Sequence, residues 1–276
     1  MLQFLSQYFA NRQIDLFAPI PLSECEIRKP YLLEREGIAD GTAILFAVPY
    51  FTRACLDPKR NLSAYAVSRD YHGFFRALFD ELLPILREKY PNEKFAGFAD
   101  HSPIAELQAA ARAGLGVIGK NSLLITEKYS SYVFLGELVT SARLPTQIKP
   151  ISACLDCGKC RAACPTEELG TCLSALTQKK GTLTEKEEAD VRSFGSVWGC
   201  DICQEVCPYT QKAIQKGTIF TEISYFKADC IPRLTLEILD GMNDETFSGR
   251  AYSWRGRETI RRNLSLMEKT EQKGDR

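Results

Sequence analysis

The sequence has no run of eighteen or more apolar residues among its 276, so it offers no candidate membrane-spanning helix. Its first residues, MLQFLSQYFANRQIDLF, mix Gln, Asn, Arg and Asp with apolar side chains. This mixture excludes the continuous apolar stretch of a signal peptide and is typical of an amphipathic helix. We therefore expect a cytoplasmic protein with no membrane partner.

The sequence also lacks an excess of either charge, because 35 Lys and Arg balance 35 Asp and Glu. A chain of zero net charge has no overall field to attract nucleic acid, although a local basic patch is still compatible with it. We find no long tandem repeat, and His72 and His101 are the two histidines. Apolar residues make up 45% and charged residues 25%, which is ordinary for a folded globular protein.

Cysteine, in contrast, is abundant, with eleven residues. In a small secreted domain this number would indicate disulfides, but this chain is larger, has no export signal and clusters its cysteines in one third of its length. Metal binding is the better interpretation. Cys25, Cys55 and Cys230 stand alone in apolar or loop contexts, where cysteine is usually a small core residue, so we assign them no role.

The first cysteine motif is C-x2-C-x2-C-x3-C-P, formed by Cys154, Cys157, Cys160 and Cys164 with Pro165. This run is typical of bacterial ferredoxins with two [4Fe–4S] clusters. Three thiolates at two-residue gaps wrap one cubane, while the fourth ligates the other cluster. A partner motif is therefore expected.

That partner is C-x2-C-x3-C-P at Cys200, Cys203 and Cys207, and Cys172 supplies its missing ligand. The predicted ligands are Cys154, Cys157, Cys160 and Cys207 for one cluster, and Cys164, Cys172, Cys200 and Cys203 for the other. Structural zinc is the alternative, because C-x2-C pairs also make tetrahedral zinc sites. The triple spacing and the Cys-Pro endings favour iron–sulfur clusters, which transfer electrons.

The first 145 residues show patterns of both strands and helices. TAILFAVPY (42–50) predicts a buried strand, and apolar residues at three- and four-residue steps predict a helix between residues 70 and 90. KFAGFAD (94–100) predicts a strand that ends at Asp100, and residues 104–116 predict a helix ended by Gly114 or Gly116. Two β-rich runs, 122–126 and 131–140, predict a hairpin.

The segment LPTQIKP (144–150) has two prolines and no helical period, as expected of a linker. We predict a mixed α/β domain at 1–145, a ferredoxin-like two-cluster module at 146–212 and a C-terminal helical segment at 213–276. The fold class is therefore α+β. Within the module, Thr184 and Glu187 have the spacing of a helix capping box.

Several strings besides the cysteines resemble those of epoxyqueuosine reductases, the cobalamin-dependent iron–sulfur enzymes that finish queuosine in the tRNA anticodon loop. The strings are AYAVSRDYH (64–72), FADHSP (98–103), ARAGLGVIGKNSLL (111–124), FLGEL (134–138), WGCDICQEVCP (198–208) and FSGRAYSWRGRETIRRN (247–263). The resemblance covers roughly residues 60 to 265, and the strings follow the family's order.

The resemblance implies a domain that cradles base-off cobalamin, clusters that deliver electrons to cobalt, and reduction of epoxyqueuosine to queuosine at the tRNA wobble position. It also implies that Asp100, which matches the aspartate of the family's D-S-A-P motif, is the proton donor. Removing an epoxide oxygen as water takes two electrons and two protons, and a carboxyl group in a desolvated pocket can supply a proton. The alternative is that Asp100 caps the helix that begins near Ile104.

The resemblance further implies a set of cobalamin contacts. These are Ser63, Tyr65, Asp100, Gly114, Gly116, Lys120, Asn121, Ser122, Leu135, Ser174 and Asp201. The glycines allow the backbone to approach a large planar cofactor, and the polar side chains can bond its amides or phosphate. The alternative is a glycine helix stop followed by ordinary surface residues.

A set of arginines in the last string can contact RNA phosphates, or can simply solvate a helix face. These are Arg250, Arg255, Arg257, Arg261 and Arg262. Such contacts would suit a tRNA partner. We also expect the protein to be a monomer and to receive its electrons from an unidentified donor.

The chain departs from the family pattern at Ser68, where glycine is usual, and at His101–Ser102, which replace Ser–Ala. It also ends at Arg276, before the helical-repeat extension of many members. His101 is a conceivable cobalt ligand, although such a histidine is more often a local hydrogen-bonding residue, and we expect His72 to be structural. Two rival functions are a corrinoid iron–sulfur reductase of another substrate, as in reductive dehalogenases, and a non-catalytic ferredoxin-like carrier.

Overall fold

The computed structural model describes residues 1–166 and 172–274, with side chains described as far as residue 267. These residues form two compact units, each built from several stretches of the chain. The sheet unit comprises Met1–Tyr50, Tyr71–Cys157 and Pro208–Ile223. The helical unit comprises Phe51–Asp70, Gly158–Cys207 and Ser224–Arg276. The mixture of helices and strands is confirmed, while the three consecutive ranges stay a prediction.

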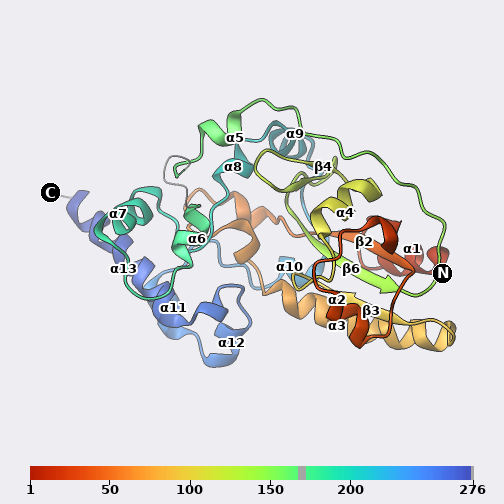
Figure 1. Cartoon of the computed structure of the whole chain (residues 1–276). Helices are drawn as coiled ribbons and strands as arrows, with labels where there is room; N and C mark the ends of the chain where they lie inside the picture. Colours follow the sequence, from red (N-terminus) through yellow and green to blue (C-terminus); the bar gives the residue numbers. More distant parts are fainter. Residues whose placement is uncertain (167–171, 275–276) are drawn as a thin grey trace. The chain divides into compact units, whose positions relative to one another are not determined.

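A four-stranded antiparallel sheet organises the sheet unit (Figure 1). Its strands, in spatial order, are β1 (Leu16–Pro21), β2 (Thr42–Pro49), β6 (Val133–Thr140) and β3 (Phe95–Phe98). All of β2 is buried, because it has a strand on each side and helices against both faces. The buried strand predicted at 42–50 is thus confirmed, as is the strand that ends shortly before Asp100.

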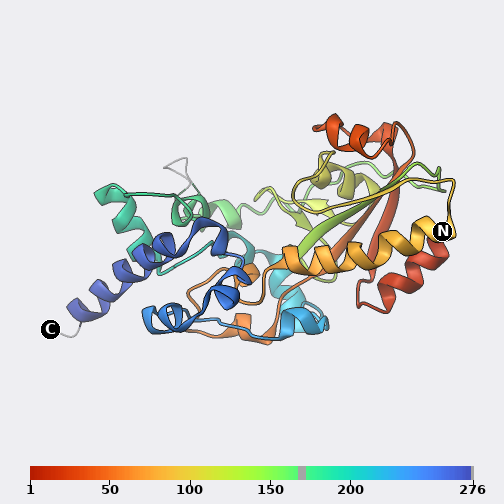
Figure 2. The same ribbon diagram turned by 90° about the horizontal axis from the view of Figure 1, so that it is seen from below.

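Alternate residues of β2 pack against different helices, as the two-residue period of a strand requires. Phe46 packs against Phe9 of α1 (Leu2–Ala10) and against Phe75 and Phe79 of α3 (Tyr71–Lys89). Figure 2 shows α3 running along the sheet. Its range confirms the helix predicted between residues 70 and 90.

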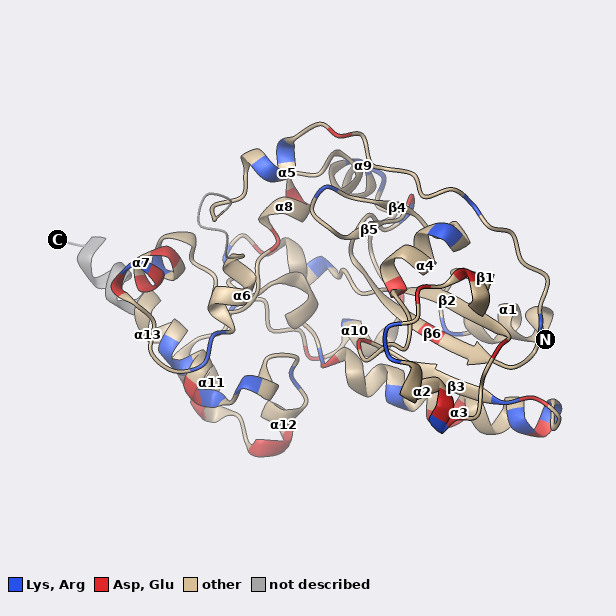
Figure 3. Ribbon diagram, viewed as in Figure 1, with Lys and Arg blue, Asp and Glu red and all other residues tan. Residues whose placement is uncertain are grey.

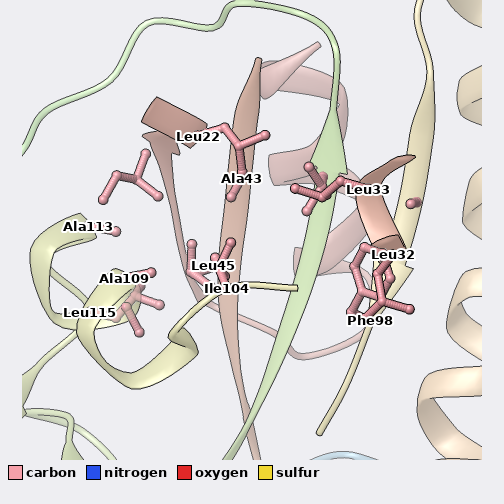
Figure 4. Close-up of a cluster of buried hydrophobic side chains, with 14 of the residues drawn as sticks. Leu22, Leu32, Leu33, Ala43, Leu45, Phe98, Ile104, Ala109, Ala113 and Leu115 are labelled. Atoms are coloured by element: carbon pink, nitrogen blue, oxygen red, sulfur yellow. The ribbon is translucent and has the colours of Figure 1, made fainter. Parts of the chain in front are cut away.

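The other face of β2 contributes to a hydrophobic cluster, drawn in Figure 4. Ala43 and Leu45 meet Leu32 and Leu33 of α2 (Pro30–Arg35) and small residues of α4 (Glu106–Ala113) in this cluster. The alanines of α4 let its backbone lie close to the strands. This packing holds α4 against β1, β2 and β6.

The hairpin predicted from 122–126 and 131–140 is wrong. The short strand β5 (Leu124–Ile125) pairs with β4 (Val117–Ile118), whereas β6 pairs with β2 and β3. Strand patterns identify which residues are extended but not which strand is the partner, because pairing depends on contacts between distant segments. The remaining elements of this unit are η1 (Leu22–Glu24) and α9 (Pro208–Lys216).

The described part of the helical unit consists of irregular segments and helices, most of which have three to six residues. They are η2 (Arg53–Leu56), η3 (Ala64–Ala66), α5 (Lys159–Ala162), α6 (Leu173–Thr177), α7 (Glu185–Phe194), α8 (Ile202–Glu205), α10 (Ser224–Lys227), α11 (Leu236–Gly241), α12 (Asp244–Ser248), η5 (Ser253–Arg255) and α13 (Arg257–Gly274). The predicted capping box is present, because Thr184 and Glu187 exchange hydrogen bonds at the start of α7. No helix in the described part of the chain is both long and apolar enough to cross a bilayer.

Candidate functional site

A cavity of about 530 Å³ lies in the sheet unit where β3 leads into α4. Asp100, Ser122 and Leu135, three of the predicted site residues, all line this cavity. Glu106, the first residue of α4, and Phe134 of β6 line it as well. We call it the carboxyl cavity. The fold therefore brings together side chains as far apart in the sequence as Arg28 and Leu135.

Two residues that line the carboxyl cavity have a left-handed backbone. Asp100 has φ of 60° and Ser122 has φ of 61°, a conformation that costs about 1–2 kcal/mol for a residue with a side chain. Such strain persists only where the surrounding structure imposes it, and it concentrates at functional sites. Two of the six described non-glycine residues with positive φ thus lie at this cavity, which supports it as the candidate site.

Asp100 accepts hydrogen bonds from two neighbouring side chains of α3. The Tyr71 hydroxyl donates to its Oδ2, and His72 Nε2 lies 3.2 Å from the same oxygen. Tyr71 is held by stacking on Phe134, with 4.1 Å between ring centroids. Partial burial would raise the pKa of Asp100, but the hydrogen bonds from His72 and Tyr71 outweigh it and lower the pKa.

These contacts decide two of the sequence-based alternatives. The residue immediately before α4 is Ala105, and no side chain caps the N-terminus of this helix. The interpretation of Asp100 as its cap is therefore wrong. His72, expected to be structural, is instead a direct partner of Asp100. His101 bonds Tyr31 Oη at 2.9 Å and Lys29 Nζ at 3.2 Å, which agrees with a local hydrogen-bonding role.

Two glutamates at this site were missed by sequence reasoning. Burial and the nearby negative charge of Asp100 raise the pKa of Glu106 to about 7. Glu137 of β6 has no solvent exposure, and this burial raises its pKa to about 8. Ser102 Oγ lies 2.8 Å from Glu137 Oε2. A charged residue inside an otherwise apolar strand pattern, as in FLGEL, is the signal that could have identified Glu137.

Gly114 and Gly116 line a second cavity of about 660 Å³ in the sheet unit. Gly114 ends α4 with φ of +88°, which confirms it as a helix stop. A Cβ at Gly116 would lie 2.4 Å from the Ile125 carbonyl oxygen. Local packing therefore requires both glycines, whatever else they contact.

Lys120 and Asn121 follow these glycines. Lys120 Nζ lies 3.2 Å from a carboxylate oxygen of Asp156, which is between Cys154 and Cys157 in the sequence. The Asn121 side-chain oxygen is buried and accepts no hydrogen bond from the described residues. An amide N–H of a bound group would satisfy this oxygen.

The other predicted cofactor contacts bond within the helical unit. Asp201 is 4% exposed, pairs with Arg60 at 2.7 Å, and accepts a hydrogen bond from Ser63 Oγ at 2.5 Å. Trp198 Nε1 donates to Tyr65 Oη at 2.6 Å. Ser174 Oγ accepts a bond of 3.1 Å from Gln178. These polar groups therefore stabilise the unit itself.

All eleven cysteines fall within the described residues, and none of them forms a disulfide bond. Burial raises the pKa of Cys200 to about 11, and the nearby Asp201 carboxylate and the Cys172 and Cys164 thiols act in the same direction. Three thiols predicted to share one cluster therefore lie close together. Within residues 1–166 and 172–274, no group of three His, Cys, Asp or Glu side chains is placed to hold a single metal ion.

The arginines of the predicted RNA patch mostly bond to the helical unit. Arg250 is 5% exposed and donates to the Asp229 carbonyl, while Arg257 donates to the carbonyl oxygens of Leu239 and Met242. The remaining three also contact other residues of this unit. Arg261 pairs with Asp240, Arg262 donates to the carbonyls of Lys179 and Gly181, and Arg255 lies over the Trp254 ring. Both charge colours run along α7, α11 and α13 in Figure 3, so this region is not uniformly basic.

Comparison with known families matches residues 153–210 to the family described as "4Fe-4S double cluster binding domain". This match spans all eight cysteines of the two predicted ligand sets. It supports iron–sulfur clusters over structural zinc.

The chain is also similar to curated epoxyqueuosine reductases. It is 32% identical to that of Lactococcus garvieae over 246 residues, which are 81% of this chain and 67% of the relative. It is 34% identical to that of Listeria monocytogenes over 213 residues, which are 72% of this chain and 54% of the relative. The chain thus covers between about half and two thirds of the length of these relatives.

A solved structure of an epoxyqueuosine reductase has a similar fold. A crystal structure of epoxyqueuosine reductase with an epoxyqueuosine-modified tRNA-Tyr stem loop matches with a TM-score of 0.78 at 25% identity. The match covers 96% of this chain and 80% of that chain. The fold is therefore shared along almost the whole sequence.

Proposed function

Because the chain belongs to the epoxyqueuosine reductase family, we propose that it reduces epoxyqueuosine to queuosine in tRNA with two [4Fe–4S] clusters and cobalamin. The observation that carries the proposal is the hydrogen-bonded group of Asp100, Tyr71 and His72 at a strained corner of the carboxyl cavity. An electron carrier without a substrate has no need of such a group. The solved relative bound to a modified stem loop adds support for the substrate.

The eight cysteines in two sets are the proposed cluster ligands. The proximity of Cys164, Cys172 and Cys200 supports one set. The helices α5 and α8, which carry Cys160 and Cys203, contact each other within the helical unit. Two clusters supply electrons one at a time, which suits a reduction that needs two.

The polar groups of the sheet unit fit cobalamin, whose rim carries amides. Ser122 and Leu135 line the carboxyl cavity, and Lys120 and Asn121 immediately precede Ser122. The unsatisfied oxygen of Asn121 matches an amide donor. We propose these four residues as contacts that hold the cofactor. Ser63, Tyr65, Ser174 and Asp201 bond within the helical unit, and their role as cofactor contacts stays a prediction. When bound, cobalamin would supply a cobalt centre that passes electrons to the substrate.

Asp100 is the proposed donor of a proton to the epoxide oxygen. Its side chain is 53% exposed, so it faces the cavity while Tyr71 and His72 fix its orientation. His72 is 49% exposed and connects Asp100 to solvent, from which the carboxyl group can regain a proton. Positioned proton transfer of this kind contributes about 10²–10⁴-fold to rate.

Transfer RNA is the proposed partner, in the cytoplasm. Since Arg250, Arg257 and Arg262 donate to carbonyl groups of the protein, Arg255 and Arg261 are the better candidates among the predicted arginines for phosphate contacts. Their contribution would appear as a salt-dependent affinity for the stem loop.

The test is a nucleoside assay on epoxyqueuosine-containing tRNA, with chain that has been reconstituted anaerobically with iron, sulfide and cobalamin. Asp100→Asn should lower turnover by about 100-fold or more while iron content and cobalamin absorbance stay unchanged. Asp80→Asn is the matched control, because Asp80 is an exposed residue of α3. Full cluster loading of the wild-type chain without any queuosine would reject the proposal and favour a carrier.

A further inference from the structure

Glu106 lies in the carboxyl cavity with Asp100, yet its surroundings are the opposite of those of Asp100. It is the first residue of α4, and its Oε2 is buried without a hydrogen-bond partner among the described residues. Asp100, by contrast, accepts bonds from the Tyr71 hydroxyl and from His72. A carboxyl group with two donors is stabilised as the anion, and one without donors is stabilised as the neutral acid.

The charges around Glu106 agree with this contrast. Burial and the Asp100 carboxylate raise its pKa to about 7, while Lys29 acts in the opposite direction. Arg28 also lines the cavity, and the N-terminus of α4 favours the anion. Burial and Asp100 outweigh these positive groups, so Glu106 keeps its proton to a higher pH than Asp100 does.

A second neutral acid lies behind Glu106 in the sheet unit. Ser102 Oγ is 2.8 Å from the Ile104 carbonyl oxygen, 2.8 Å from Glu137 Oε2, and accepts the Ile104 N–H at 3.0 Å. One hydroxyl has one proton and cannot donate to both oxygens. If Glu137 is protonated, it donates to Ser102, and Ser102 donates to Ile104.

The protonated state of Glu137 also avoids a buried charge. Its Oε1 has no partner among the described side chains and backbone groups, so an ionised Glu137 would be an unexposed carboxylate with a single hydrogen bond, which is costly. Glu106 and Glu137 interact electrostatically. Two negative charges at these positions would repel each other, and a neutral Glu137 removes that repulsion.

We propose that Glu106 is a second catalytic acid of the carboxyl cavity, which holds in the resting protein one of the two protons that the epoxide oxygen takes up. The inference rests on the proposed function. In the reaction, both carbon–oxygen bonds of the epoxide break, a carbon–carbon double bond forms, and the oxygen leaves as water. Two equivalents of a one-electron reductant supply two electrons through the clusters. Glu106 gives one proton, and Asp100, which rests as the anion and first takes a proton from solvent, gives the other.

The protonation of Glu106 can be measured without turnover. Infrared difference spectra of the full chain between pH 5.5 and 8.5 should contain a protonated-carboxyl band that is lost as pH rises through about 7. This band should be missing in Glu106→Gln, where only the Glu137 band that is lost as pH rises through about 8 remains, and present in Glu185→Gln. Glu185 is the matched control because it is also the first residue of a helix, α7, but is exposed. An unchanged spectrum in Glu106→Gln would overturn the inference.

The catalytic role is tested by single-turnover rates of the reconstituted enzyme over the same pH range. Wild type should slow as pH rises through about 7, because an acid must be protonated to donate. Glu106→Gln should slow product formation by about 100-fold and lose this pH dependence, with iron and cobalamin content unchanged. Glu106→Asp should recover part of the rate and the pH dependence, because it restores an acid.

Failure of the proposed function and failure of the inference about Glu106 give different results. A wild-type enzyme that makes no queuosine at any pH would reject the proposed function and the inference with it. A Glu106→Gln enzyme that keeps the wild-type rate and pH profile would reject the inference alone.

Discussion

In the sheet unit, the segments that line the carboxyl cavity are anchored to a buried sheet and to α4, whereas in the helical unit most cluster cysteines lie on short helices or loops. Phe46 of β2 is packed against three aromatic rings. The cysteine-bearing helices α5 and α8 have four residues each, too few for a helix to be stable alone. The first site can therefore form before its cofactor binds, while the second should need its clusters.

The largest expected effect comes from removing the clusters. Chelation under oxidising conditions should destabilise the helical unit by on the order of 5 kcal/mol or more, since folding around a metal site takes much of its stability from the ligand bonds. Hydrogen exchange should then become fast in α6 and α7 but remain slow in β2 and β6. Equal loss of protection in both units would contradict the comparison.

The next effect is expected in the sheet unit, from Phe46→Ala. Deleting this ring leaves a cavity among Phe9, Phe75 and Phe79 and should cost about 3–5 kcal/mol, measured by urea unfolding. Phe194→Ala is the control, because Phe194 of α7 is 39% exposed and should change stability by less than about 1 kcal/mol. Similar costs for the two variants would show that β2 is not the centre of the core.

Glu137 should make the stability of the sheet unit depend on pH. Its pKa is raised from 4.5 to about 8 on folding. Its contribution to the free energy of unfolding is therefore complete below pH 4.5 and is lost as pH rises through 8. This loss should be on the order of 2–4 kcal/mol. Glu137→Gln, which cannot ionise, should flatten the dependence measured by urea unfolding.

Glu106 contributes to this pH dependence with the same sign, because its pKa is also raised. The pH dependence of stability that remains in the Glu137→Gln variant should therefore disappear when the Glu106→Gln substitution is added. A wild-type sheet unit that gains stability between pH 5 and 8 would contradict neutral glutamates at this site.

The smallest effect is expected at the capping box of the helical unit. Thr184→Ala removes the hydroxyl that accepts from the Glu187 N–H and should cost about 1 kcal/mol. The change should be seen as faster hydrogen exchange in the first turn of α7. Thr182→Ala is the control, since Thr182 is exposed and lies outside the helix. No difference between the two would show that α7 is held by its apolar contacts alone.

Much of the sheet unit could be predicted from local patterns. The apolar run at 42–50, the helical period before Tyr90 and the glycine stop at Gly114 each depend on residues close in sequence, and the structure has an element at each place. The partner of β6 could not be predicted, because several strands offered the same extended pattern. The resemblance identified Asp100, but gave no sign that His72 would be its partner.

By itself, the sequence determined the iron–sulfur motifs, since cluster ligation depends on cysteine spacing within short segments, and it determined the capping box for the same local reason. Only the tertiary structure decided which acids lie close together. Glu106 and Glu137 are 31 positions apart on different elements. Burial raises the pKa of both, the Asp100 carboxylate adds to the effect at Glu106, and Glu106 adds to the effect at Glu137. Tertiary folding also decided that arginines spaced along a helix bond to carbonyl groups from other segments, because these donors and acceptors meet only when the chain packs.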